Sequence, residues 1–201
     1  LQQETSSFSQ QQNLNQNQVQ NINTLLEDSL QTTCLTLIMT NQMEDGKATN
    51  RSKQTFELEP ANATLHYATE CFEGAKAYRT IDNDIIMYRI NENFKRMLTS
   101  HVQLGMPSFD VSEMVECCRQ LIEIEKAWIP ERPMHSLYIR PTSICMDNRL
   151  GLSSIQKSKT FIIMSPVGPY YPRGFVPVKL YCDTTVIRAW PNGFGDKKVG
   201  G

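Results

Sequence analysis

The residues best suited to chemistry lie at the end of the chain. Residues 194–201 read FGDKKVGG, which sets Lys197 and Lys198 among glycines that let a backbone approach a ligand closely. A lysine amine in such a segment can form a Schiff base with an aldehyde cofactor. The same Asp-Lys-Lys run is typical of a solvated turn, and on composition alone the turn is the stronger interpretation.

An arginine and a Tyr-Arg pair are the other candidates for a binding site. Arg96 falls in a segment with helical periodicity, where it is either a surface residue or a guanidinium that holds a phosphate bidentately. Tyr138 and Arg140 alternate with Leu137 and Ile139, so on a strand they share one face. That face either receives a carboxylate or meets solvent, and the alternation favours neither.

Common catalytic and metal-binding patterns are absent from the sequence. His66, His101 and His135 have no partner at catalytic or metal-ligand spacing, and structural roles are favoured for them. No glycine-rich dinucleotide motif, phosphate-binding P-loop or nucleophile elbow is present. The six cysteines form no CxxC pair and no Cys/His ligand set, which favours reduced thiols and no metal site.

Composition bounds the class of protein. The 201 residues are 40% hydrophobic, enough for one domain with a core. Lys and Arg number 20 against 21 Asp and Glu, so the charge predicts no nucleic-acid partner and no anionic membrane surface. No apolar run reaches the roughly 18 residues of a membrane span. We therefore expect a soluble, intracellular, globular protein.

The chain divides into three parts by composition. Residues 1–33 are rich in Gln and Asn and predict a disordered tail. No Lys or Arg precedes Lys47, which argues against an Arg-rich transit peptide and favours the cytoplasm, with a mitochondrial location left open. We expect an N-terminal α+β domain over 34–185 and an interdomain segment over 186–201. A start at Leu1 and a stop at Gly201 suggest a fragment.

Strand and helix patterns predict an α+β fold with an antiparallel or mixed sheet and two helices. Asp110 is the expected N-cap of the second helix, with Glu113 in the capping-box position. Its apolar stripe would be Met114, Cys117, Cys118, Leu121 and Ile124, and that of the first helix Phe94, Met97, Leu98 and Val102. Strands are expected at 35–39, 85–88, 137–139, 160–164 and 178–181, and helices at 93–104 and 111–128.

Several segments in order along residues 56–201 resemble the branched-chain amino-acid aminotransferases. Any one of them would be weak evidence, but their shared order and spacing make the resemblance strong. The segments are LHYA at 65–68, FEGAKAYR at 72–79, NFKRM at 93–97, SLYIRP at 136–141, SPVGPY at 165–170, RAW at 188–190 and GDKKVGG at 195–201.

The resemblance implies a fold-type IV enzyme that uses pyridoxal 5′-phosphate. Such enzymes move the amino group of leucine, isoleucine or valine to 2-oxoglutarate, and they are homodimers. Lys198 matches the catalytic lysine that holds the cofactor and moves the proton, and Arg96 matches the arginine that binds the cofactor phosphate. Arg188 is a further cofactor-binding candidate. The positions that match the substrate pocket are Tyr67, Phe72, Tyr138, Arg140 and Tyr170.

The chain also departs from the family pattern. The segment between Met43 and Leu65 is shorter than in the family, and Met146-Asp147-Asn148-Arg149 replaces its usual turn. The chain ends at the lysine motif, so the second domain and its acidic partner for the pyridine nitrogen would be missing. We therefore expect little activity from the chain alone. The alternatives are a D-amino-acid transaminase, an aminodeoxychorismate lyase, or a truncated interaction protein without catalysis.

Overall fold

The computed structural model describes residues 34–40, 49–51, 55–171, 176–187 and 189–200. The tail predicted to be disordered, residues 1–33, lies outside the described residues. The elements, in chain order, are β1 (Cys34–Thr40), β2 (Thr49–Arg51), α2 (Ala63–Tyr67), β3 (Glu70–Phe72), β4 (Ala75–Arg79), β5 (Ile85–Met87), α3 (Ile90–Leu104), α4 (Val111–Ile124), the 3-10 helix Lys126–Trp128, β6 (Ser136–Cys145) and β7 (Lys157–Val167).

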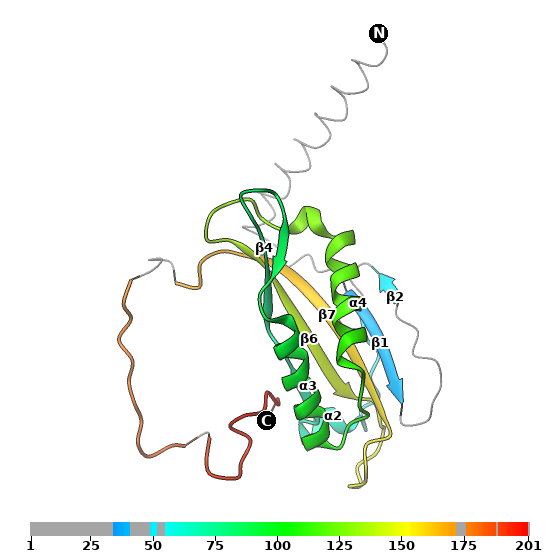
Figure 1. Cartoon of the computed structure of the whole chain (residues 1–201). Coiled ribbons are helices and arrows are strands. Elements are labelled where there is room, and N and C mark those ends of the chain that lie inside the picture. The colour runs from blue at the N-terminus through cyan, green and yellow to red at the C-terminus, as the bar shows by residue number, and fades with distance from the viewer. Residues whose placement is uncertain (1–33, 41–48, 52–54, 172–175, 188, 201) are drawn as a thin grey trace, which may run out of the picture. The chain divides into compact units, whose positions relative to one another are not determined.

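A seven-stranded antiparallel sheet forms the body of the fold (Figure 1). The strand order is β2-β1-β7-β6-β4-β5, and β3 also pairs with β6. The long strand β6 therefore holds β7 along one edge and both β3 and β4 along the other. The predicted α+β class is confirmed.

β3 and β4 are one strand in register, interrupted at Glu73 and Gly74. Phe72 lies opposite Thr142 and Ala75 lies opposite Ile139, so the same register continues across the break. Pro141 of β6 lies at the interruption, and it has no N–H to donate to the neighbouring strand. Its carbonyl still accepts from the N–H of Glu73 at 2.8 Å.

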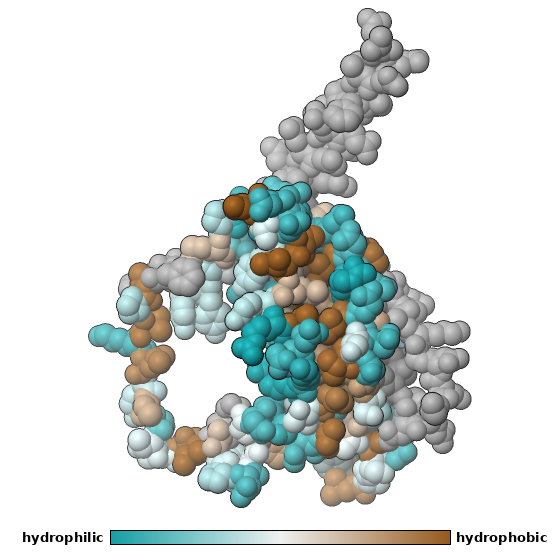
Figure 2. All heavy atoms as spheres, in the orientation of Figure 1, coloured by the Kyte–Doolittle hydropathy of each residue, from teal (hydrophilic) through white to brown (hydrophobic). Residues whose placement is uncertain are grey.

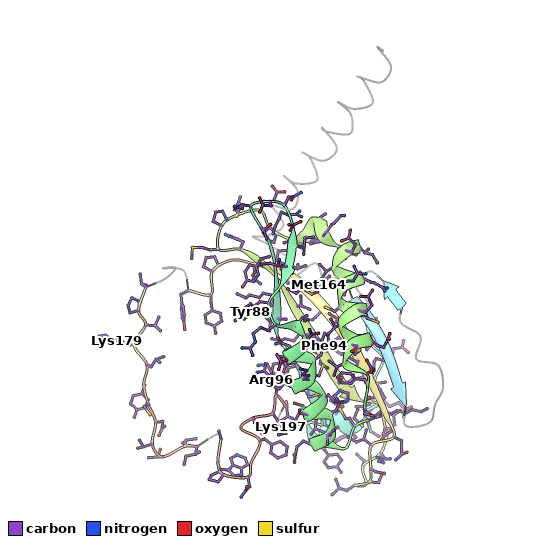
Figure 3. The ribbon with its side chains drawn as sticks, viewed as in Figure 1. Tyr88, Phe94, Arg96, Met164, Lys179 and Lys197 are labelled. Atoms are coloured by element: carbon purple, nitrogen blue, oxygen red, sulfur yellow. The ribbon has the colours of Figure 1, made fainter. Side chains whose placement is uncertain are left out.

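The helices α3 and α4 cover one face of the sheet, and the core lies between these layers (Figure 1). Figure 3 places Phe94 of α3 and Met164 of β7 in this interior. Leu137 and Ile139 of β6 are fully buried in the same core. Because side chains alternate along a strand, Tyr138 and Arg140 lie on the opposite face.

The predicted apolar stripes of the two helices are partly wrong. In α3 the buried residues repeat through Phe94, Met97 and His101, which leaves Val102 one residue off the stripe and 69% exposed. α4 ends at Ile124, before the predicted end, and that residue is 63% exposed while Ile122 is buried. The N-cap is confirmed, since Asp110 accepts from the N–H of Glu113 at 2.9 Å.

Two strand predictions need correction. Residues 178–181 form no strand, and Leu180 and Tyr181 are 88% and 91% exposed. Strand formation needs a partner ladder, and among the described residues this segment has none, so its β-forming side chains stand open to solvent (Figure 2). β5 exists, but it is the last strand of the sheet, so Ile86 is 51% exposed rather than buried. The predicted domain boundary at 185/186 stays a prediction.

A buried polar chain links α3 to the sheet. His101 Nδ1 lies 2.7 Å from the carbonyl oxygen of Pro107, and Nε2 lies 2.7 Å from Ser143 Oγ. Ser143 Oγ in turn lies 2.5 Å from Thr160 Oγ1. A carbonyl only accepts, so Nδ1 carries the proton and Nε2 accepts from the Ser143 hydroxyl. Burial lowers the pKa of His101, which is held as a neutral ring.

We expect the stability of the fold to fall in mild acid because of His101. Its pKa is lowered on folding, so the unfolded chain binds the proton more readily, and stability is lost as the pH falls below about 6.5. The slope should approach about 1.4 kcal/mol per pH unit, the limit for one proton. Urea unfolding at pH 7.5 and 5.5 measures it. His101→Gln should flatten this component, whereas His66→Gln, at an exposed histidine, should retain it.

Within the described residues no helix has the length and apolar character needed to cross a bilayer. The described part of the chain also contains no group of three or more His, Cys, Asp or Glu residues placed to hold a metal ion.

Candidate active site

The lysine segment lies along the free edge of β3. The N–H of Phe72 donates to the carbonyl of Lys198 at 3.0 Å, and Cys71 forms a bridge with Val199. The N–H of Gly200 donates to the carbonyl of Glu70 at 3.1 Å. These contacts fix the backbone of 198–200 beside the strand that carries Phe72.

The two neighbouring lysines have different surroundings. Lys197 Nζ pairs with Asp196 Oδ2 at 2.5 Å. Lys198 Nζ instead lies 4.9 Å from the centroid of the Phe72 ring, a cation-π contact. The N–H of Lys198 donates to Ser100 Oγ on α3 at 3.1 Å. Lys198 is therefore the lysine whose amine reaches the predicted site residues.

Phe72, Tyr138 and Arg140 form one cluster on the sheet face opposite the helices. Arg140 Cζ lies 4.6 Å from the Phe72 centroid and 5.2 Å from the Tyr138 centroid. Nη2 and Nε of Arg140 donate to Tyr138 Oη at 2.8 and 3.1 Å. The predicted shared face is confirmed, and the cations of Arg140 and Lys198 approach the same Phe72 ring.

A cavity of about 440 Å³ lies between the start of α3 and the strands β4 and β6. Its basic residues are Lys76, Arg89 and Arg96, which make it suited to an anionic group. Tyr138 lines the cavity and bonds Arg140, so the cavity adjoins the Phe72 cluster. Figure 3 shows Arg96 and Tyr88 on the side of the fold away from Phe94, and Figure 2 shows a hydrophilic surface over α3. The other lining residues are Gly74, Ala75, Tyr78, Tyr88, Glu92 and Asn93.

Arg96 is held by a carboxylate from the strand break. Its Nε and Nη2 donate to the two oxygens of Glu73 at 2.5 and 2.7 Å. The hydrogen bond to Glu73 raises the pKa of Arg96 above its ordinary value. The Glu73 side chain is fully buried, whereas that of Arg96 is 49% exposed. The guanidinium is therefore fixed on one edge and open toward solvent.

Gly74 allows Tyr138 to approach the strand break. A Cβ at this position would lie 2.4 Å from Tyr138 Oη, which two hydrogen bonds hold to Arg140. We expect Gly74→Ala to displace that hydroxyl and to lower the free energy of unfolding by about 1–3 kcal/mol. Urea unfolding measures the change. Gly151→Ala is the matched control, since no atom lies within 4 Å of its Cβ, and equal losses in the two variants would contradict the prediction.

Three predicted site residues are not brought to this cluster. Tyr67 Oη donates to the carbonyl of Leu150, at the other end of α2 from its cap. Tyr170 is 86% exposed and packs edge-on against Tyr171 with centroids 4.9 Å apart. Arg188 lies outside the described residues. Their roles stay predictions.

No family model matches the chain. Individual relatives do match. The cytosolic branched-chain-amino-acid aminotransferase of Mus musculus is 46% identical over 145 residues, which is 72% of this chain and 38% of the relative. The cytosolic enzyme of Saccharomyces cerevisiae is 45% identical over 147 residues, 73% of this chain and 39% of the relative. The mitochondrial enzyme of Schizosaccharomyces pombe is 43% identical over 142 residues, 71% of this chain and 33% of the relative.

The chain belongs to the branched-chain-amino-acid aminotransferase family. It spans at most 39% of the length of these three relatives. The names of the relatives include both cytosolic and mitochondrial proteins.

Solved structures of this family share the fold. The branched-chain amino acid aminotransferase of Escherichia coli superposes with a TM-score of 0.52 at 23% identity, over 67% of this chain and 40% of that chain. The T.th. enzyme, solved with pyridoxamine 5′-phosphate, gives 0.51 at 23% identity, over 67% and 40%. The predicted fold-type IV architecture is confirmed.

Three residues of this aminotransferase chain escaped the sequence reasoning. Asn93 and Ser100 flank Arg96 at spacings of three and four, which places them on the same helix surface. Asn93 Nδ2 donates to Glu73 Oε2 at 3.1 Å and to the Gly74 carbonyl at 2.9 Å. The available signals were this helical spacing and a lone acidic residue, Glu73, between Phe72 and Gly74.

Proposed function

We propose that this chain contributes its site to a transaminase that moves the amino group of leucine, isoleucine or valine to 2-oxoglutarate with pyridoxal 5′-phosphate. One observation carries the proposal. The amine of Lys198 and the guanidinium of Arg140 share the ring of Phe72, and the basic cavity lined by Arg96 adjoins this cluster at Tyr138. Amine, carboxylate receptor and phosphate receptor are thus neighbours.

The residues present fit that cofactor. The cavity volume falls within the usual range for small-molecule sites. Arg96, supported by Lys76 and Arg89, would hold the phosphate through charge-assisted hydrogen bonds. Lys198 Nζ would hold the aldehyde carbon. The cofactor ring, when bound, supplies the electron sink for breaking the bond at the substrate α-carbon.

The chain's own residues would then do three things. Lys198 Nζ takes the α-proton of the amino acid and returns it to the neighbouring carbon, because a long flexible amine reaches both. Arg140 receives a substrate carboxylate, including the second one of glutamate. Phe72 and Tyr138 exclude water from a branched aliphatic side chain.

Four further assignments complete the proposal. Tyr67 and Tyr170 line the substrate pocket, and Arg188 adds charge at the cofactor. The active protein is a homodimer. We place it in the cytoplasm, with the mitochondrion as the alternative compartment.

Amino-donor preference tests this function. Purified protein loaded with pyridoxal 5′-phosphate is given 2-oxoglutarate and either L-leucine or D-alanine, and the glutamate formed is quantified. We expect glutamate from L-leucine and at least about tenfold less from D-alanine, one pocket contact's worth of discrimination. A preference for D-alanine, or no glutamate from either donor, would contradict the proposal.

A further inference from the structure

Glu73 is a buried carboxylate for which the proposed chemistry has no use. Its side chain has no exposed surface, although it lies beside a basic cavity. A buried charge is costly unless it is paired and hydrogen-bonded. Glu73 has four donors on its two oxygens, namely Arg96 Nε at 2.5 Å, Arg96 Nη2 at 2.7 Å, Asn93 Nδ2 at 3.1 Å and the N–H of Gly74 at 3.2 Å.

The backbone around Glu73 is fixed independently of these contacts. Its N–H donates to the Pro141 carbonyl of the central strand β6 at 2.8 Å. Asn93 also bonds the Gly74 carbonyl, so the next residue is tied to α3 as well. The carboxylate is therefore a rigid acceptor, because both its backbone and one of its oxygens are held by groups other than Arg96.

A rigid acceptor determines how the Arg96 guanidinium lies. Glu73 takes Nε and Nη2, the edge that a carboxylate binds bidentately. In the described part of the chain no group hydrogen-bonds Nη1, and Arg96 lines the cavity. Without Glu73 the half-exposed side chain would sample other rotamers, and ordering it on a ligand would cost conformational entropy.

We propose that Glu73 is a positioning residue whose carboxylate holds Arg96 so that the cavity accepts the phosphate group of its ligand. The inference rests on the proposed function, in which Arg96 binds that phosphate. Pure electrostatics gives the opposite expectation. A negative charge next to a phosphate site repels the phosphate, so its removal alone would strengthen binding.

Matched ligands and variants separate the two effects. The dissociation constants of pyridoxal 5′-phosphate and of pyridoxal, which lacks the phosphate, are measured by equilibrium dialysis. For Glu73→Gln we expect a rise of about tenfold or more for the phosphate ester, about 1.4 kcal/mol, and less than about twofold for pyridoxal. Glu92→Gln removes a carboxylate from the same cavity lining without touching Arg96, and it should leave the phosphate ester bound equally or more tightly.

Three outcomes decide the inference. Tighter or unchanged binding of the phosphate ester by Glu73→Gln overturns the positioning role. If Arg96→Ala also leaves the ratio of the two constants unchanged, the proposed phosphate site itself fails, which is a distinct result. Should Glu73→Gln not fold, Glu73→Asp keeps the charge and shortens the reach, and it must lower the affinity for the phosphate ester relative to pyridoxal for the inference to stand.

Discussion

Replacing Lys198 with alanine is expected to abolish stable retention of pyridoxal 5′-phosphate and to lower transamination by about a thousandfold or more. The variant removes the amine that lies over Phe72 and leaves the backbone bonds of residue 198 to Ser100 and Phe72 in place. Visible absorbance of the protein after gel filtration measures retention, and glutamate formation from L-leucine measures activity.

Lys197→Ala is the control for this result. The Lys197 amine pairs with Asp196, so its loss should leave cofactor retention unchanged. Equal losses in both variants would mean that the lysine segment matters only for its charge, and would contradict the assignment of Lys198.

Replacing Arg96 with alanine is expected to raise the dissociation constant of pyridoxal 5′-phosphate by about 30- to 100-fold. A hydrogen-bonded pair between two charged groups contributes about 2–3 kcal/mol, which corresponds to this range. The fold should also lose about 2 kcal/mol of stability, because Glu73 is left buried without its cation, although the exposed guanidinium limits the loss.

The two effects of Arg96→Ala can be separated. Adding Glu73→Gln to Arg96→Ala should restore much of the stability, since the unpaired charge is gone, and should leave cofactor affinity low. Recovery of affinity together with stability would show that Arg96 acts on the fold and not on the phosphate.

Local signals in the sequence were sufficient for much of the fold. The capping pair Asp110 and Glu113 predicted the start of α4, because an N-cap depends on residues three apart. Alternation along β6 predicted that Tyr138 and Arg140 share a face, and their hydrogen bonds confirm it. The order of the family motifs predicted the architecture.

Contacts that depend on tertiary structure were beyond the sequence. Glu73 and Arg96 are 23 residues apart, and Ser100 and Lys198 are 98 apart, so no periodicity connects them. The failed strand at 178–181 has the same cause, because β-propensity says nothing about whether a partner strand is available. The break between β3 and β4 likewise follows from Pro141 on another strand.

The most direct test of the central claim is to find which lysine holds the cofactor. The protein is incubated with pyridoxal 5′-phosphate, reduced with borohydride and digested, and the labelled peptide is sequenced by mass spectrometry. We predict a single label on Lys198, with Lys197 and the cavity residue Lys76 unmodified. A label on Lys197 or Lys76, an even spread over surface lysines, or no label would contradict the account.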